Sequence, residues 1–181
     1  AQLAAEILAR GETPDLLALQ EQAFALMLAD YARLYPDRSF PTERLAEAVY
    51  RMRLADRLDF AGDDFAEEIA VMEPHKMLLR RVTATAGGTT VAWRFRHDRL
   101  VDFFLYHAFF AGADGPERQR AHLDDPRFRG VYLMIALRAP LDVARALRER
   151  LVVHAATTGD HSLSDDVVRL LLGRDRADVA A

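Results

Sequence analysis

The residues between 77 and 96 change the spacing of apolar side chains from that of a helix to that of a strand. Val91, Trp93 and Phe95 alternate with small or polar residues, which is the period of a β-strand. A similar stretch covers residues 77–84, and the glycine pair at 87–88 between the two is typical of a hairpin turn. The sequence therefore predicts a β-hairpin in a chain that is otherwise helical.

Three segments before this hairpin have the apolar spacing of helices. They run from Pro14 to about Tyr35, from Glu43 to Leu58, and from Asp64 to the residue before Pro74. Asp64 is expected to cap the third helix, with Glu67 three residues later completing a capping box. Three helices followed by a hairpin is the element order of a winged-helix domain, and the hairpin is its wing.

The chain after the hairpin is expected to be helical throughout. Residues 98–111 are apolar on most sides, so this helix should be central. The stretch from Gly112 to Pro116 has linker composition and is the predicted domain boundary. Further helices should begin at Asp125-Pro126 and at Ala139-Pro140, and Ser162 or Ser164 should cap a last one.

The expected fold class is therefore mainly α. A winged-helix domain with an N-terminal helical lead-in should cover residues 1–112. A small helical bundle should cover residues 113–181, and its short connections imply antiparallel neighbours. Helix pairs of this kind can begin a helical repeat scaffold.

Charges are unevenly distributed around the predicted hairpin. Residues 76–99 carry six basic side chains and one acid, whereas residues 59–73 carry six acids and no base. A two-residue turn at Gly87-Gly88 would place Arg81 directly opposite Arg94, which is unfavourable without a nearby anion. Either the two blocks neutralise each other in the fold, or the wing contacts phosphate or DNA. The candidate contacts are Arg80, Arg81, Arg94 and Arg96.

The string WRFRHDRLVDFFLYHAFF, residues 93–110, resembles the end of the winged-helix domain in STAND-class NTPases, the NACHT and NB-ARC-like switches. The matching residues are Phe95, His97, Asp98, Leu100, Asp102, Phe103 and Phe104. In that family the histidine reaches the phosphates of bound ADP and helps to hold the off state. The resemblance implies that His97 and Asp98, with Arg96 where methionine often stands, form an ADP-phosphate site.

The chain contains no GxxxxGK[ST] loop and no apolar strand that ends in paired acids, so it lacks the nucleotide-binding core of that family. The resemblance then implies a non-catalytic regulatory and scaffold fragment, not an enzyme, that holds no cofactor by itself. ADP or ATP would belong to the parent chain. The expected partners are an intramolecular ATPase module and proteins that bind the helical segment.

Two other functions fit parts of the sequence. A winged-helix transcription regulator would bind DNA through the wing arginines, but the net charge of −4 and the acids of the third predicted helix oppose this. Those acids are Asp64, Glu67, Glu68 and Glu73. An HD-type metal phosphohydrolase would use His97 and Asp98 together with His75, but the pair follows a strand instead of lying within a helical bundle. A purely structural role is also open, with Asp98 as a helix cap.

Cysteine is absent, which excludes disulfides, thiolate metal sites and cysteine nucleophiles. No apolar run approaches the roughly 20 residues that a membrane helix needs. The first residues lack a basic leader before an apolar run. We therefore expect a cytoplasmic protein with no membrane partner.

Overall fold

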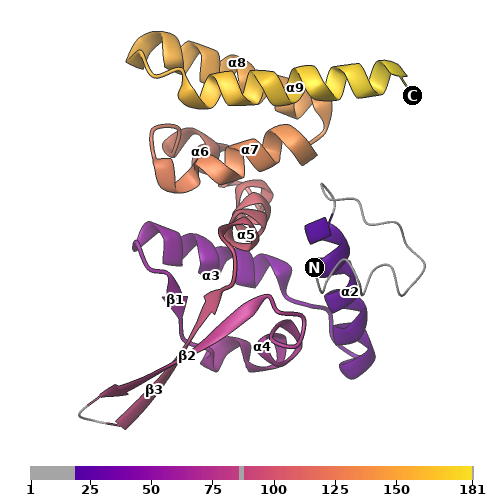
Figure 1. The fold of residues 1–181 in the computed structure, drawn as a ribbon, viewed down its shortest axis with the longest axis vertical. Helices are drawn as coiled ribbons and strands as arrows, with labels where there is room; N and C mark the ends of the chain where they lie inside the picture. Colours follow the sequence, from indigo (N-terminus) through magenta and orange to yellow (C-terminus); the bar gives the residue numbers. More distant parts are fainter. Residues whose placement is uncertain (1–18, 86–87, 181) are drawn as a thin grey trace.

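The computed structural model describes residues 19–85 and 88–180, and it is mainly helical with a small three-stranded antiparallel sheet (Figure 1). The α-helices are α2 (Leu19–Leu34), α3 (Thr42–Leu54), α4 (Ala66–Met72), α5 (Asp98–Phe110), α6 (Gly115–Ala121), α7 (Arg129–Arg138), α8 (Leu141–Thr158) and α9 (Ser162–Ala180). Two 3₁₀ turns, η1 (Asp63–Phe65) and η2 (Pro126–Phe128), precede α4 and α7. The strands are β1 (Asp59–Phe60), β2 (Leu78–Thr85) and β3 (Gly88–Phe95).

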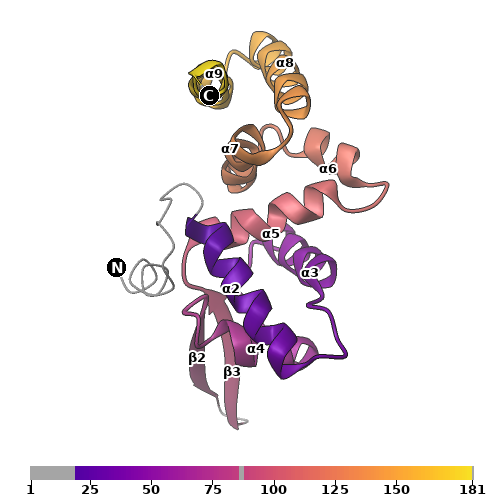
Figure 2. The same cartoon turned by 90° about the vertical axis from the view of Figure 1, so that its right-hand side faces the viewer.

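Helix α5 lies between two groups of elements (Figures 1 and 2). On one side are α2, α3, α4 and the sheet, and on the other are α6 to α9. Helix α5 packs against α3 and against α7, and one continuous cluster of buried side chains runs through both groups. The predicted central position of this helix is therefore confirmed.

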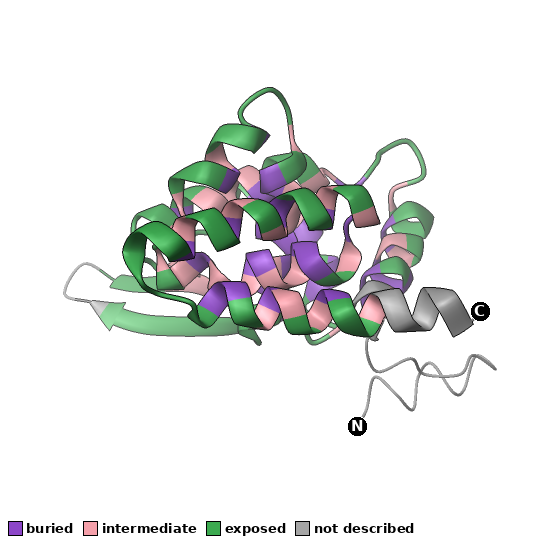
Figure 3. Ribbon diagram, turned by 90° about the horizontal axis from the view of Figure 1, so that it is seen from above, coloured by how far each residue is buried: buried purple, intermediate pink, exposed green. Residues whose placement is uncertain are grey.

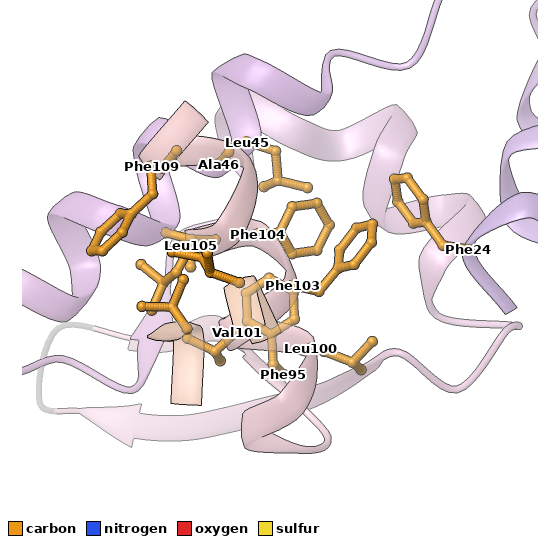
Figure 4. Close-up of a cluster of buried hydrophobic side chains, with 14 of the residues drawn as sticks. Phe24, Leu45, Ala46, Phe95, Leu100, Val101, Phe103, Phe104, Leu105 and Phe109 are labelled. Atoms are coloured by element: carbon orange, nitrogen blue, oxygen red, sulfur yellow. The ribbon is translucent and has the colours of Figure 1, made fainter. Parts of the chain in front are cut away.

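The aromatic side chains of α5 form the middle of the core (Figure 4). Phe104 and Phe109 are fully buried. The Phe104 ring lies 5.4 Å from that of Phe95, and Phe103 lies 4.6 Å from Phe24. Buried residues face inward along every packed helix, whereas the hairpin is mostly exposed (Figure 3). Aromatic burial around α5 thus joins the strand end to the helices.

The second predicted helix ends earlier than its apolar pattern suggested. Helix α3 stops at Leu54 instead of Leu58. Asp56 adopts a left-handed conformation with φ of 52°, and the Arg57 N–H donates to the Met52 carbonyl. This turn leads the chain into β1.

The predicted capping box at Asp64 does not form. Asp64 lies inside η1, and Phe65 precedes the first residue of α4 without any side-chain cap. Glu67 instead forms an ion pair with Arg38. The 3₁₀ turn replaces the expected first helical turn because it carries Phe65 into the core, where only 5% of it is exposed. The predicted start of the first helix at Pro14 lies outside the described residues, and its end before Pro36 is confirmed.

Both predicted strands are present, but their register differs from the prediction by two residues. Thr85 pairs with Gly88, which places Arg94 opposite Leu79 and Arg81 opposite Ala92. The prediction placed the turn at Gly87-Gly88, whereas Gly88 belongs to β3 with φ of 129°, a conformation that only glycine adopts easily. Strand β1, which pairs with β3, was not predicted because two residues show no periodicity.

The helices α7, α8 and α9 follow one another through short connections and pack against one another. Gly159 ends α8 in the left-handed conformation, with φ of 79°, which is a common helix end. Ser162 is the first residue of α9, and its N–H donates to Asp160, whereas the Ser164 hydroxyl donates to the His161 carbonyl. Neither serine therefore precedes the helix as the predicted cap. None of the described helices is long and apolar enough to cross a bilayer.

Candidate functional site at the junction of β3 and α5

The turn between β3 and α5, residues 96–99, is held firmly at both ends. The Arg96 N–H donates to the Met77 carbonyl at 2.9 Å, which continues the strand pairing by one residue. Phe95, at the end of β3, is 5% exposed and packs on Phe60. On the other side, Leu100 is buried and its N–H donates to the His97 carbonyl. The backbone of the turn is therefore fixed by the core.

The side chains of this turn are all exposed. They are Arg96, His97, Asp98 and Arg99. His97 has extended geometry, with φ of −138° and ψ of 140°, and it is the residue before the first helical residue. No side chain caps α5, so the predicted cap at Asp98 is wrong. Asp98 is already helical, and its carboxylate lies in the first turn, where the helix dipole favours negative charge.

This arrangement has the chemistry of an anion site. The first N–H groups of a helix have no intrahelical partner, and α5 is 13 residues long. Arg96, His97 and Arg99 are exposed basic residues at this end of the helix, and Asp98 is an acid in its first turn. A helix N-terminus of this kind binds phosphate through its N–H groups and its dipole.

The wing arginines divide into two pairs. Asp59 of β1 accepts from the Arg94 Nε at 2.6 Å and from Arg81 at 3.0 Å. These hydrogen bonds, that from Arg94 above all, lower the pKa of the Asp59 carboxyl. The anion expected near the hairpin is thus part of the chain. Arg80 and Arg96 make no ion pair with any described residue.

The acids of α4 and η1 do not neutralise the hairpin. Glu68 is buried and accepts a hydrogen bond from the Tyr31 hydroxyl at 3.1 Å. Asp64 lies 4.0 Å from Arg44, and Glu67 pairs with Arg38. Of the six acids in residues 59–73, Asp59 is therefore the one that pairs with arginines of the hairpin. The predicted neutralisation of one charged block by the other holds for Asp59 alone.

Asp102 is a half-buried carboxyl at the contact of α3, α5 and α7. A Cβ atom on Gly130 of α7 would lie 2.0 Å from its Oδ2 atom. Burial raises the pKa of Asp102 from 3.8 to about 6, against the opposing effect of Arg53 on α3. The Nε atom of Arg53 is buried without a hydrogen-bond partner. Nothing in the sequence marks Gly130, 28 residues away, as the position that makes room for this carboxyl.

A second polar cluster joins α6 to α3. Arg118 pairs with Glu47 at 2.7 Å and lies over the Tyr50 ring at 4.5 Å. The Tyr50 hydroxyl contacts the His122 Nε2 at 2.8 Å. Burial lowers the pKa of His122. Sequence analysis missed this cluster because its members are far apart along the chain.

The histidines give no metal site in the described part of the chain. His75 Nε2 lies 2.9 Å from Asp30 on α2. Among residues 19–85 and 88–180, no three His, Asp or Glu side chains lie close enough together to hold a metal ion.

Compared with known proteins, the chain matches no protein-family model, no curated protein and no solved structure. A functional assignment must therefore be argued from the residues of the chain and from their geometry.

Proposed function

We propose that this chain is a non-catalytic regulatory module of a STAND-type switch, in which Arg96 and His97 contact the phosphates of ADP held by an ATPase module of the same protein. The observation that carries the proposal is the turn 96–99, whose backbone is fixed by the core while its basic side chains stay exposed at an open helix N-terminus. Asp98 belongs to this site as the residue that stabilises the first turn of α5.

Two features of the fold support the wider proposal. In the described part of the chain, the three helices α2, α3 and α4 precede the hairpin, which is the order of a winged-helix domain. Helices α7, α8 and α9 pack against one another, and the apolar residues Val152, Val153 and Leu172 of α8 and α9 are exposed. We assign this helical segment to the binding of protein partners.

The proposed role of His97 can be tested in the parent protein, which would contain the ATPase module. His97→Ala should speed the release of a fluorescent ADP analogue about ten- to a hundredfold, because one charge-assisted hydrogen bond contributes about 1.5–3 kcal/mol. His161→Ala, which removes an exposed histidine before α9, is the matched control and should change nothing. Unchanged release in His97→Ala would refute the proposal.

The isolated chain supplies a second check. It should bind ADP far more weakly than the parent, since the phosphates have no other contact in it. His97→Ala should leave its free energy of unfolding within about 0.5 kcal/mol, because the side chain is exposed. A large loss of stability would make His97 a structural residue instead.

DNA binding by the wing is the second candidate, because Arg80 and Arg96 are exposed and unpaired among the described residues. The net charge of −4 and the engagement of Arg81 and Arg94 by Asp59 weigh against it. Fluorescence anisotropy with a duplex should show no submicromolar binding at physiological salt. Tight binding with a steep salt dependence would favour this function.

A further inference from the structure

The outer edge of β2 is an unpaired strand edge. The sheet order is β1, β3, β2, so among residues 19–85 and 88–180 β2 has a neighbour on one side only. The Arg96 N–H donates to the Met77 carbonyl, and the two residues occupy paired positions that extend the ladder. Because hydrogen-bonded and non-bonded pairs alternate in an antiparallel ladder, the N–H and C=O groups of Arg80, Val82 and Ala84 point away from β3.

This edge is exposed and longer than the free edge of β3. Strand β2 has eight residues, whereas β1 covers β3 at Trp93 and Arg94. Val82 is 56% exposed and Leu79 is 41% exposed. The hairpin projects away from the helices (Figure 1), and residues 79–84 of β2 are exposed (Figure 3). Natural proteins rarely leave such an edge open without a use or a block.

The charges beside the edge select the kind of segment that it can bind. Side chains of neighbouring strand residues point to opposite faces, so Arg80 lies on one face of the hairpin and Arg81 on the other. Arg80 has no ion pair within the described residues, and Arg81 shares Asp59 with Arg94. An added strand would therefore meet the unpaired Arg80 on one face. On the other face it would meet Arg81, which with Arg94 shares the single carboxylate of Asp59.

We propose that the edge of β2 binds an extended acidic segment of a partner protein, which adds a fourth strand to the sheet. Backbone hydrogen bonds to Arg80, Val82 and Ala84 would hold the segment, and two adjacent carboxylates would meet Arg80 and Arg81. This mode of recognition is strand addition. It does not involve His97, so it stands independently of the proposed ADP site.

Two other occupants fit the same edge less well. A second copy of the chain would bring another Arg80 and Arg81 to the edge, and like charges across neighbouring strands are unfavourable. Duplex DNA would use the arginines but not the outward N–H groups of Arg80, Val82 and Ala84. The open backbone together with basic side chains favours the acidic strand.

The experiment uses the full chain and a fluorescent peptide of about seven residues, of threonine and valine with two adjacent glutamates at its centre. Val82→Pro removes an outward N–H without removing a bond to β3 and should weaken binding at least tenfold. Val91→Pro is the matched control, because Val91 is the cross-strand partner of Val82 and its N–H points to the opposite edge. Binding by this variant should be unchanged.

Three further measurements complete the test. Arg80→Gln should weaken binding several-fold, and a peptide with lysines in place of the glutamates should not bind. Amide hydrogen exchange should slow at Arg80, Val82 and Ala84 when the acidic peptide is added to the unmodified chain. This readout keeps the proposal testable even if Val82→Pro fails to fold.

Several results would overturn the proposal. These are no binding at about millimolar peptide, equal loss in Val82→Pro and Val91→Pro, or no slowing of exchange at the edge. Sedimentation that shows a dimer lost in Val82→Pro would assign the edge to a second copy. Duplex binding that survives Val82→Pro but not Arg80→Gln would assign the surface to DNA.

Discussion

At the scale of single residues, the Asp102 carboxyl links the stability of the fold to pH. Its carboxyl is half-buried between α5 and α7, and burial raises its pKa to about 6. A pKa above the unfolded value of 3.8 means that folding favours the protonated form. The contribution of protonated Asp102 to the free energy of unfolding is therefore complete below about pH 3.8 and is lost as the pH rises through about 6.

Asp102→Asn should remove this pH dependence. At pH 7.5 it should raise the free energy of unfolding by about 1–2 kcal/mol, since the charge no longer has to be buried and partial exposure reduces the full effect of the shift. At pH 4.5 the variant should match the unmodified chain more closely. Urea unfolding at both pH values measures the difference, with the exposed Asp142→Asn as the control. An equal effect at both pH values would contradict the argument.

The Asp102 carboxyl fits against α7 because Gly130 has no Cβ atom at the point of contact. Gly130→Ala would put a Cβ atom 2.0 Å from Oδ2, so the Asp102 side chain would have to move, at a cost of about 1–3 kcal/mol. In an Asp102→Ala background the same substitution should cost much less. The double-mutant cycle should therefore show a coupling of about 1 kcal/mol or more. If the effects of Gly130→Ala and Asp102→Ala on stability simply add, α7 shifts to make room for the new Cβ atom and the Asp102 side chain does not move.

At the scale of elements, periodic stretches were predictable and contacts between distant residues were not. The apolar spacing of α5 and the alternation in β3 predicted both elements, because side-chain burial sets those patterns. The hairpin register was wrong by two residues because a glycine pair can lie at either of two places in a turn. The cap at Asp64 failed because core packing of Phe65 outweighed a local hydrogen bond.

The ion pairs of Asp59 hold β1 to the hairpin, and their removal should loosen this element selectively. Asp59→Ala leaves Arg81 and Arg94 without their acceptor and should cost about 0.5–2 kcal/mol. The lowered pKa of Asp59 means that its contribution is present above the unfolded pKa and is lost as the pH falls through the folded pKa. Hydrogen exchange should speed up in β2 and β3 before α8.

The exposed Asp63→Ala provides the control for Asp59, because Asp63 is close in sequence and forms no ion pair among the described residues. It should leave exchange in the hairpin unchanged. Equal exchange rates in the two variants would show that hydrogen bonding within the ladder, and not the ion pairs, holds the hairpin.

At the scale of the whole molecule, α5 packs against elements on both sides of the predicted domain boundary. The candidate site at residues 96–98 could be placed from the sequence, because a strand end and a helix start are both local features. Asp102 and the Arg118 cluster could not, because each depends on partners from another helix. The predicted boundary after residue 112 stays a prediction, but the buried cluster continues across it through α5.

This continuity predicts that the chain unfolds as one unit. Trp93 is the only tryptophan and reports on the sheet, whereas far-UV circular dichroism reports mainly on the helices. In urea the two transitions should coincide, as expected for a cooperative domain.

Arg118→Met breaks the ion pair with Glu47, in which the Arg118 side chain is only 16% exposed. It should lower the free energy of unfolding by about 1–3 kcal/mol and shift both urea midpoints together. Arg120→Met, at an exposed position on the same helix, should change neither. One transition is expected because the two halves of a core shared through α5 cannot separate without exposing its aromatic side chains to water. Two separate transitions would contradict this and would make residues 1–112 and 113–181 independent folding units.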